Sequence, residues 1–198
     1  MKRFLIFLCS VLVLSGCASG GRVSLEDGDK MMQTDQWTKM DSEQAAKKIM
    51  QDLITHGGFI DYQQELGHKP KLYIKKVENK TADPYFNIDE LNNAFLTEIS
   101  RSGKFKLLDE KNAKEVEDAL KKTHDGRTKQ SDVRSLVKKS GAEVLIFGEI
   151  TSQPKREGRQ VVNEYTVNIK LTDMESNEEI TRMQYGVSKY KKQGWFSL

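Results

Sequence analysis

Apolar residues are distributed differently at the start of this chain and in the rest of it. Residues 4–14 form an almost unbroken apolar run behind the basic start Met1-Lys2-Arg3, and small residues follow. The run is too short to span a bilayer as a mature helix, and its three parts are ordered as in a secretory signal peptide. From residue 41 onward, apolar and polar positions follow the periods of helices and strands, which predicts a single folded domain over residues 41–198.

Several stretches carry apolar residues at helical spacing, each bounded by a residue that starts or stops a helix. The first begins at Asp41 or Ser42, either of which can cap it, and ends at Gly57-Gly58. The second ends near Gly103, and Asp109 caps the third. The predicted helices occupy residues 41–56, residues 87–102, the stretch that follows residue 109, and residues 131–140.

Strand-like patterns lie between and after these helices. The run 142–150 is continuously apolar, which predicts a central strand buried on both faces, whereas the polar residues 78–81 predict a turn. Early strands separated by helices can pair in parallel, and the last three, joined by short loops, should pair antiparallel. The expected fold is α/β (α+β), a mixed sheet flanked by helices. Its predicted strands are 71–77, 105–108, 142–150, 160–173 and 179–190.

A cysteine stands directly behind the small residues that end the N-terminal apolar run. The stretch Leu14-Ser15-Gly16-Cys17 resembles the lipobox of bacterial lipoproteins, in which the thiol is diacylated, the signal is cut before it and the new N-terminus is acylated, as with palmitate. We therefore expect residues 1–16 to be a signal peptide and Cys17 to be the lipidation site. An ordinary signal peptide with a chance cysteine is the alternative. Several acyl chains together hold a protein at a membrane.

Loss of the signal would also change the charge and the cysteine content. Removing Lys2 and Arg3 lowers the formal net charge from +3 to +1, which argues against a nucleic-acid partner. The chain has 2 cysteines, Cys9 within the signal and Cys17. The folded domain would therefore hold no disulfide and no thiol site, and the lipid would be its attachment to the membrane.

Residues 17–40 are rich in Gly, Ser, Asp and Gln and lack hydrophobic periodicity, which predicts a lipidated N-terminus followed by a flexible tether. Such a tether reaches on the order of 25 Å. Its one large aromatic, Trp37, is expected to pack on the edge of the domain, with contact to a partner or the membrane as the alternative. No proline precedes Pro70, so the tether is not a stiff polyproline spacer.

No pattern of catalytic residues is found. The three histidines, His56, His68 and His124, lie at no metal-ligand spacing, and the phosphate-loop, nucleophile-elbow and zinc-protease motifs do not occur. The sequence therefore predicts no enzyme, no catalytic or metal site, no cofactor and no small-molecule substrate. A periplasmic hydrolase would need a polar cleft with a carboxylate pair, which the sequence does not indicate.

The candidate partner-binding residues are few. Tyr85 and Phe86, in a predicted loop, and Trp195, near the end of the chain, are aromatics of the kind that carries binding energy when exposed. Asn79 and Thr81 are either contact residues or the side chains of a backbone-bonding turn. Lysines cluster at 75–76 and at 189–192, and they either protect a solvated strand edge or meet an anionic polymer or acidic partner.

Several stretches together with the lipobox resemble the LpoB family of lipoprotein activators of penicillin-binding proteins. These are 77–81, 102–109, 141–150, 178–180 and 189–195. The resemblance implies an outer-membrane lipoprotein facing the periplasm, which binds and activates a bifunctional class A penicillin-binding protein. It also implies a domain related to the N-terminal domain of TolB and to CsgG, here expected as a monomer. Ala18 behind the lipidated cysteine agrees with outer-membrane sorting. A CsgG-like secretion or envelope-assembly lipoprotein is the alternative.

Overall fold

The structure, a computed structural model, describes residues 34–83, 86–124, 139–157 and 160–190. It is an α+β domain with a mixed sheet and helices, as the sequence predicts. No helix in these four ranges is long and apolar enough to cross a membrane. The elements in chain order are α2 (Lys39–Thr55), α3 (Gly57–Leu66), β1 (Lys71–Ile74), β2 (Glu78–Lys80), α4 (Ile88–Ser102), β3 (Lys106–Leu107), α5 (Glu110–His124), β4 (Val144–Glu157), β5 (Gln160–Asp173) and β6 (Glu179–Tyr190).

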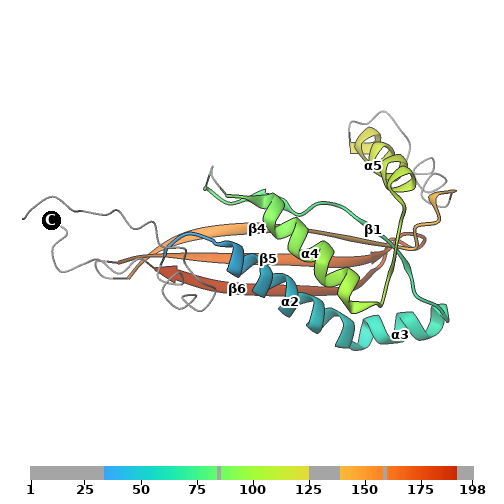
Figure 1. Cartoon of the computed structure of the whole chain (residues 1–198), viewed down its shortest axis with the longest axis horizontal. Coiled ribbons are helices and arrows are strands. Elements are labelled where there is room, and N and C mark those ends of the chain that lie inside the picture. Colours follow the sequence, from blue (N-terminus) through green and yellow to red (C-terminus); the bar gives the residue numbers. More distant parts are fainter. Residues whose placement is uncertain (1–33, 84–85, 125–138, 158–159, 191–198) are drawn as a thin grey trace, which may run out of the picture. The chain divides into compact units, whose positions relative to one another are not determined.

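The sheet has the strand order β3-β1-β4-β5-β6, and β2 also pairs with β4. Strand β1 pairs in parallel with β3 and with β4, whereas β4, β5 and β6 form an antiparallel meander. Helices α2 and α4 lie across these long strands (Figure 1). Both predicted modes of strand pairing are therefore confirmed.

The core lies between the sheet and helices α2 and α4. Alternate positions of the strands and one face of each helix point into it, because side chains repeat every second residue in a strand and about every 3.6 residues in a helix. Its fully buried members include Ile49, Leu53, Leu72, Leu91, Ile99, Val144, Ile150, Val167, Ile169 and Leu171.

The opposite face of the sheet is covered in part by α5. A small cluster of Tyr73, Val116, Ala142 and Met174 joins that helix to the sheet. Two-sided burial of β4 is therefore wrong, although its central position is confirmed. Val144, Ile146 and Ile150 are buried, but Leu145 and Phe147 are half-buried and Glu149 is exposed.

Two further elements differ from the prediction. Residues 78–80 are not a turn but strand β2, because their backbone pairs in parallel with residues 149–151 of β4. Helix α3 was not predicted at all. It begins directly after α2, where the imidazole Nδ1 of His56 accepts a hydrogen bond from the Gly58 backbone N–H over 3.1 Å. The predicted helix 131–140 falls almost wholly outside the described residues.

Candidate functional site

The turn after β2 contains two of the predicted contact residues. The Asn79 Oδ1 accepts hydrogen bonds from the Thr81 backbone N–H at 2.9 Å and from the Thr81 hydroxyl at 2.7 Å. Asn79 is exposed and Thr81 is half-buried. These side chains therefore form a backbone-bonding turn, which leaves the outer surface of Asn79 open to solvent. Their contact with a partner stays a prediction.

Phe86 is buried. The prediction that it is an exposed aromatic, on which its contact role depended, is therefore wrong. The Phe86 side chain is only 9% exposed, and its ring lies 5.9 Å from that of Trp37. Trp37 in turn lies 5.4 Å from the ring of Tyr165 and donates a hydrogen bond of 2.7 Å to the Ser42 hydroxyl. The expected packing of Trp37 on the edge of the domain is confirmed. The other predicted site residues, Cys17, Tyr85 and Trp195, lie outside the described residues.

Lys189 is buried and not part of a solvated basic edge. Its ammonium group lies 2.6 Å from the Asp41 carboxylate, and both side chains are 4% exposed. The same carboxylate oxygen accepts hydrogen bonds from the backbone N–H and the hydroxyl of Thr38, the N-cap of α2. The pair therefore joins the start of α2 to the end of β6. At 75–76, by contrast, the lysines form exposed ion pairs, typical of a solvated face.

A pocket of about 500 Å³ lies between α3 and the turn that joins β5 to β6. The Tyr62 hydroxyl on its wall donates a 2.8 Å hydrogen bond to Asp173. Burial raises the pKa of Asp173, but hydrogen bonds from the Ser176 backbone N–H and from Tyr62 outweigh it and hold the pKa below its ordinary value. Burial and the Asp173 carboxylate raise the pKa of Tyr62. The pocket is acidic, and its carboxylates are those of Asp61, Glu65, Asp173, Glu175, Glu178 and Glu179.

The lowered pKa of Asp173 does not indicate a catalytic acid. A catalytic acid at neutral pH needs a carboxyl with a raised pKa, and that of Asp173 is lowered. Tyr62, with its pKa raised, stays protonated at neutral pH. Within the described ranges, no group of three His, Cys, Asp or Glu side chains is placed to hold a metal ion. The pocket can attract cations or basic groups, but it offers no reactive pair.

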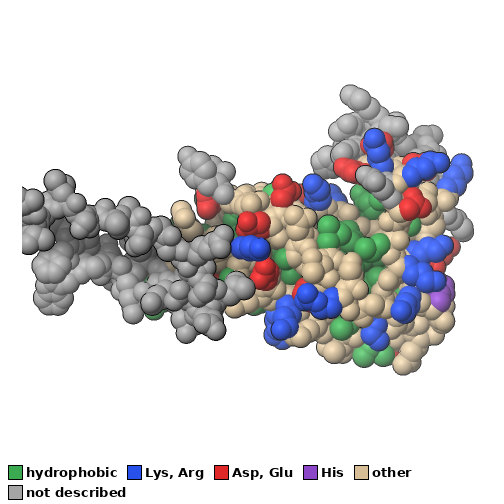
Figure 2. Space-filling view, viewed as in Figure 1, with side chains coloured by type: hydrophobic (Ala, Val, Ile, Leu, Met, Phe, Trp, Pro, Cys, Tyr) green, Lys and Arg blue, Asp and Glu red, His purple; other side chains and the backbone are tan. Residues whose placement is uncertain are grey.

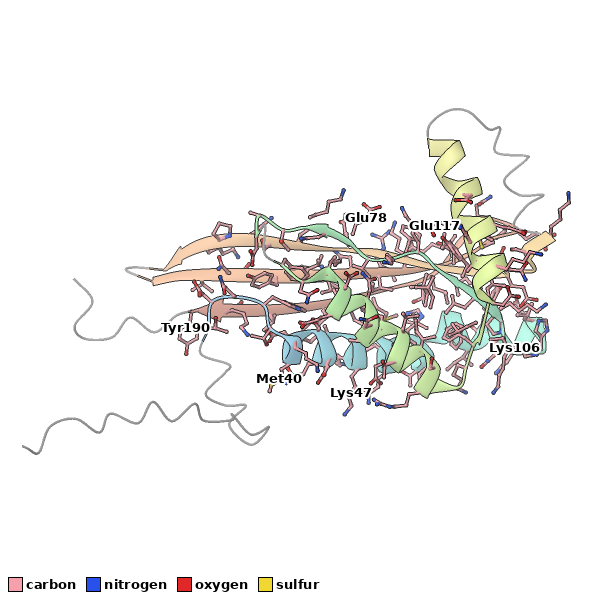
Figure 3. All side chains as sticks on the ribbon, turned by 45° about the horizontal axis from the view of Figure 1, so that its top comes forward. Met40, Lys47, Glu78, Lys106, Glu117 and Tyr190 are labelled. Atoms are coloured by element: carbon pink, nitrogen blue, oxygen red, sulfur yellow. The ribbon has the colours of Figure 1, made fainter. Side chains whose placement is uncertain are left out.

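Four exposed lysines lie together at the start of β1 and β3, and we call them the lysine surface. They are Lys69, Lys71, Lys104 and Lys106. The parallel register places Lys71 directly beside Lys106. In Figure 2, Lys and Arg side chains gather at this end of the molecule, where Figure 3 labels Lys106.

Sequence reasoning missed this surface because its two halves are more than 30 residues apart in the chain. A signal was nevertheless present. The pattern Lys-x-Lys stands at the start of two predicted strands, at Lys69-Pro70-Lys71 and at Lys104-Phe105-Lys106. Adjacent parallel strands bring both repeats to one edge of the sheet.

Comparisons with known proteins place the domain in a family. The family described as "Peptidoglycan-synthase activator LpoB" matches residues 41–181, well over half of the chain. No curated protein sequence matches the chain.

Similar solved structures include the LpoB C-terminal domain from Salmonella enterica. It is 16% identical, the match covers 74% of this chain and 98% of that one, and the TM-score is 0.52. The LpoB C-terminal domain from Escherichia coli is also 16% identical, with 75% and 99% covered and a TM-score of 0.49. At such identity, the Salmonella structure supports the fold alone. Its fold and the family match over residues 41–181 agree, and the chain belongs to the LpoB family of peptidoglycan-synthase activators.

Proposed function

We propose that the chain is a non-enzymatic outer-membrane lipoprotein that binds and activates a bifunctional class A penicillin-binding protein. The family match over residues 41–181 carries this proposal, because it spans nearly all the described elements, from α2 to the beginning of β6. The lipobox ending at Cys17 supports the lipid anchor. Through that anchor the domain would face the periplasm, where peptidoglycan synthases assemble the cell wall.

The chemistry of the described surface agrees with binding rather than turnover. Its pocket is lined by carboxylates, and its Tyr62 hydroxyl donates a hydrogen bond to Asp173 that joins α3 to the β5–β6 turn. Its exposed lysine surface at the start of β1 and β3 and its acidic pocket between α3 and the β5–β6 turn suit recognition of a charged macromolecular surface. Activation would then arise from docking on the synthase and not from a reaction on this chain.

The experiment that tests this function measures glycan-chain polymerisation and peptide crosslinking by purified class A synthases of the same cell. The full chain, purified in detergent, is added at increasing concentration. We expect a several-fold rise in rate that saturates as the complex forms. No binding and no stimulation with any class A synthase would contradict the proposal, and a ring-shaped oligomer in detergent would favour the CsgG-like alternative.

Two variants refine the same assay. We expect Tyr85→Ala to weaken stimulation, because an aromatic side chain in a partner interface contributes much of the binding energy, on the order of 2 kcal/mol. The matched control is Tyr190→Ala, which removes a tyrosine that is 45% exposed at the end of β6. If the Tyr85→Ala and Tyr190→Ala variants stimulate the synthase equally, Tyr85 does not contribute to the interface.

The lipid anchor has its own test. Cys17→Ser removes the thiol that would be acylated, so the chain should leave the outer-membrane fraction of cells, and labelled palmitate should no longer be incorporated. Cys9→Ser is the matched control, because it changes the other cysteine of the chain and leaves the lipobox intact. Unchanged membrane fractionation and labelling of the Cys17 variant would contradict the anchor.

A further inference from the structure

The lysine surface is a feature that the fold does not require. Lys71 and Lys106 lie side by side on β1 and β3, and like charges directly opposite each other destabilise a sheet. None of its four lysines forms an ion pair with a described residue, whereas Lys75 and Lys80, close by in the chain, both pair with Glu78. The repulsion between Lys71 and Lys106 lowers the stability of the sheet, which indicates that these lysines serve an interaction with another molecule.

Carboxylates also lie near the lysine surface. One oxygen of Glu143, the residue before β4, lies 2.8 Å from His68 Nε2, and the other accepts a hydrogen bond from the Lys71 backbone N–H at 2.7 Å. Other acidic side chains lie before and along α5, which packs on β1: Asp109 accepts a hydrogen bond from the Asn112 backbone N–H, and Glu117 and Asp118 help to raise the pKa of Tyr73 on β1. The lysine surface therefore has acidic neighbours, and its distinguishing feature is the exposed register of Lys71 beside Lys106.

The lysine surface lies far along the sheet from the segment at which the described chain begins. The chain joins the domain near Asp35, whose carbonyl accepts a hydrogen bond from Asn163 over 3.0 Å. Asn163 is opposite Pro154, whereas Leu72 of β1 is opposite Val144, ten residues earlier in β4. At about 3.3 Å per residue the two points are roughly 30 Å apart. The lysine surface thus lies at the end of the sheet away from Asp35.

We propose that the lysine surface is the docking face for an acidic surface of the peptidoglycan synthase. This inference rests on the proposed function and adds to it the face used and the charge of the partner. Lysine ammonium groups on flexible stems are hydrated point charges, which suit long-range attraction to clustered carboxylates better than bidentate recognition of a single group. Such a surface suits an acidic protein partner better than a neutral one.

The test measures the binding kinetics of the purified synthase to the full chain in detergent, at low and at physiological salt. The variants are Lys106→Glu alone and Lys104→Glu with Lys106→Glu. The control, Lys39→Glu with Lys47→Glu, makes the same charge change on exposed positions of α2. We expect the double variant to lower the association rate about tenfold or more at low salt, with a shallower salt dependence, and the control to change it little.

Stability distinguishes docking from a structural role. The carboxylate introduced by Lys106→Glu would stand opposite Lys71, so the like-charge pair becomes an attractive one. We therefore expect the melting temperature of this single variant to be equal to or higher than that of the wild type while binding weakens. A lower melting temperature with an unchanged association rate would overturn the proposal.

Other outcomes separate this proposal from the proposed function. If the wild type stimulates the synthase and the double variant binds it equally well, the docking face is wrong and the function stands. If the wild type binds no class A synthase, the function fails and the docking face falls with it. If the double variant loses binding only to phosphatidylglycerol vesicles or to isolated peptidoglycan, the surface recognises those polymers or lipids, and docking on the synthase is overturned.

Discussion

At the scale of single residues, the buried pair of Asp41 and Lys189 makes a prediction about stability. Asp41→Ala removes the counter-ion of a buried ammonium group together with the acceptor that caps α2 through Thr38. We expect the free energy of unfolding to fall by about 3–5 kcal/mol in urea denaturation. Lys189→Met should cost less, because the Asp41 carboxylate keeps its two hydrogen bonds from Thr38. If the free energy of unfolding falls by less than about 1 kcal/mol in both variants, the Asp41–Lys189 pair is exposed to solvent and the prediction is wrong.

Phe86 provides a second residue-scale prediction, because burial makes it a core residue and not a contact residue. Phe86→Ala removes a ring packed on Trp37 and should lower the free energy of unfolding by about 3 kcal/mol. Leu96→Ala is the control, since Leu96 is 42% exposed and should cost far less. Urea denaturation of both variants checks this. If the Phe86→Ala variant is as stable as the wild type but does not stimulate the synthase, Phe86 is a contact residue and the prediction of a core role is wrong.

At the scale of elements, Asp173 links α3 to the β5–β6 turn in a pH-dependent way. Because its folded pKa lies below the ordinary value, the ionised carboxylate stabilises the fold above the unfolded pKa of about 3.9. That contribution is lost as pH falls through the folded pKa. Asp173→Asn should therefore have a lower melting temperature than the wild type at pH 7, and the difference should shrink below about pH 4.

The control for this prediction is Asp61→Asn, an exposed carboxylate of the same pocket. Its melting temperature should stay close to that of the wild type at both pH values, because surface substitutions change stability by no more than about 0.5 kcal/mol. Melting curves at pH 7 and pH 3 provide the comparison. A difference between Asp173→Asn and the wild type that grows on acidification would contradict the lowered pKa.

The elements that the sequence predicts best are those whose signals are local. Strands β5 and β6 have the predicted bounds, because strict alternation and a polar turn define them within their own residues. Strand β2 was missed because its only support is pairing with β4, which a linear pattern does not contain. Helix α3 was missed because two glycines open it and a histidine caps it. The lysine surface likewise depends on a register between distant strands.

At the scale of the whole molecule, the proposed function depends on how far the domain can travel from the membrane. The predicted tether is flexible, so its reach grows only with the square root of its length, and about 25 Å is available. Deleting residues 20–31 would leave only residues 18–19 and 32–33 between Cys17 and the segment from Thr34 onward that contacts the domain, and would lower the reach to about 12 Å. Stimulation by the shortened chain in detergent should equal that of the wild type, since reach does not matter there.

In cells the same deletion should slow the incorporation of labelled cell-wall precursor, because the lipid would then hold the domain short of its synthase. The matched control replaces residues 20–31 with Gly and Ser, which keeps the length and so should keep the activity. Lower activity in detergent would show that residues 20–31 take part in binding directly. Full activity of the shortened chain in cells would mean that the synthase comes within reach of the membrane that carries the lipid. The prediction that the reach of the tether limits activation would then be wrong, although the chain would still activate the synthase.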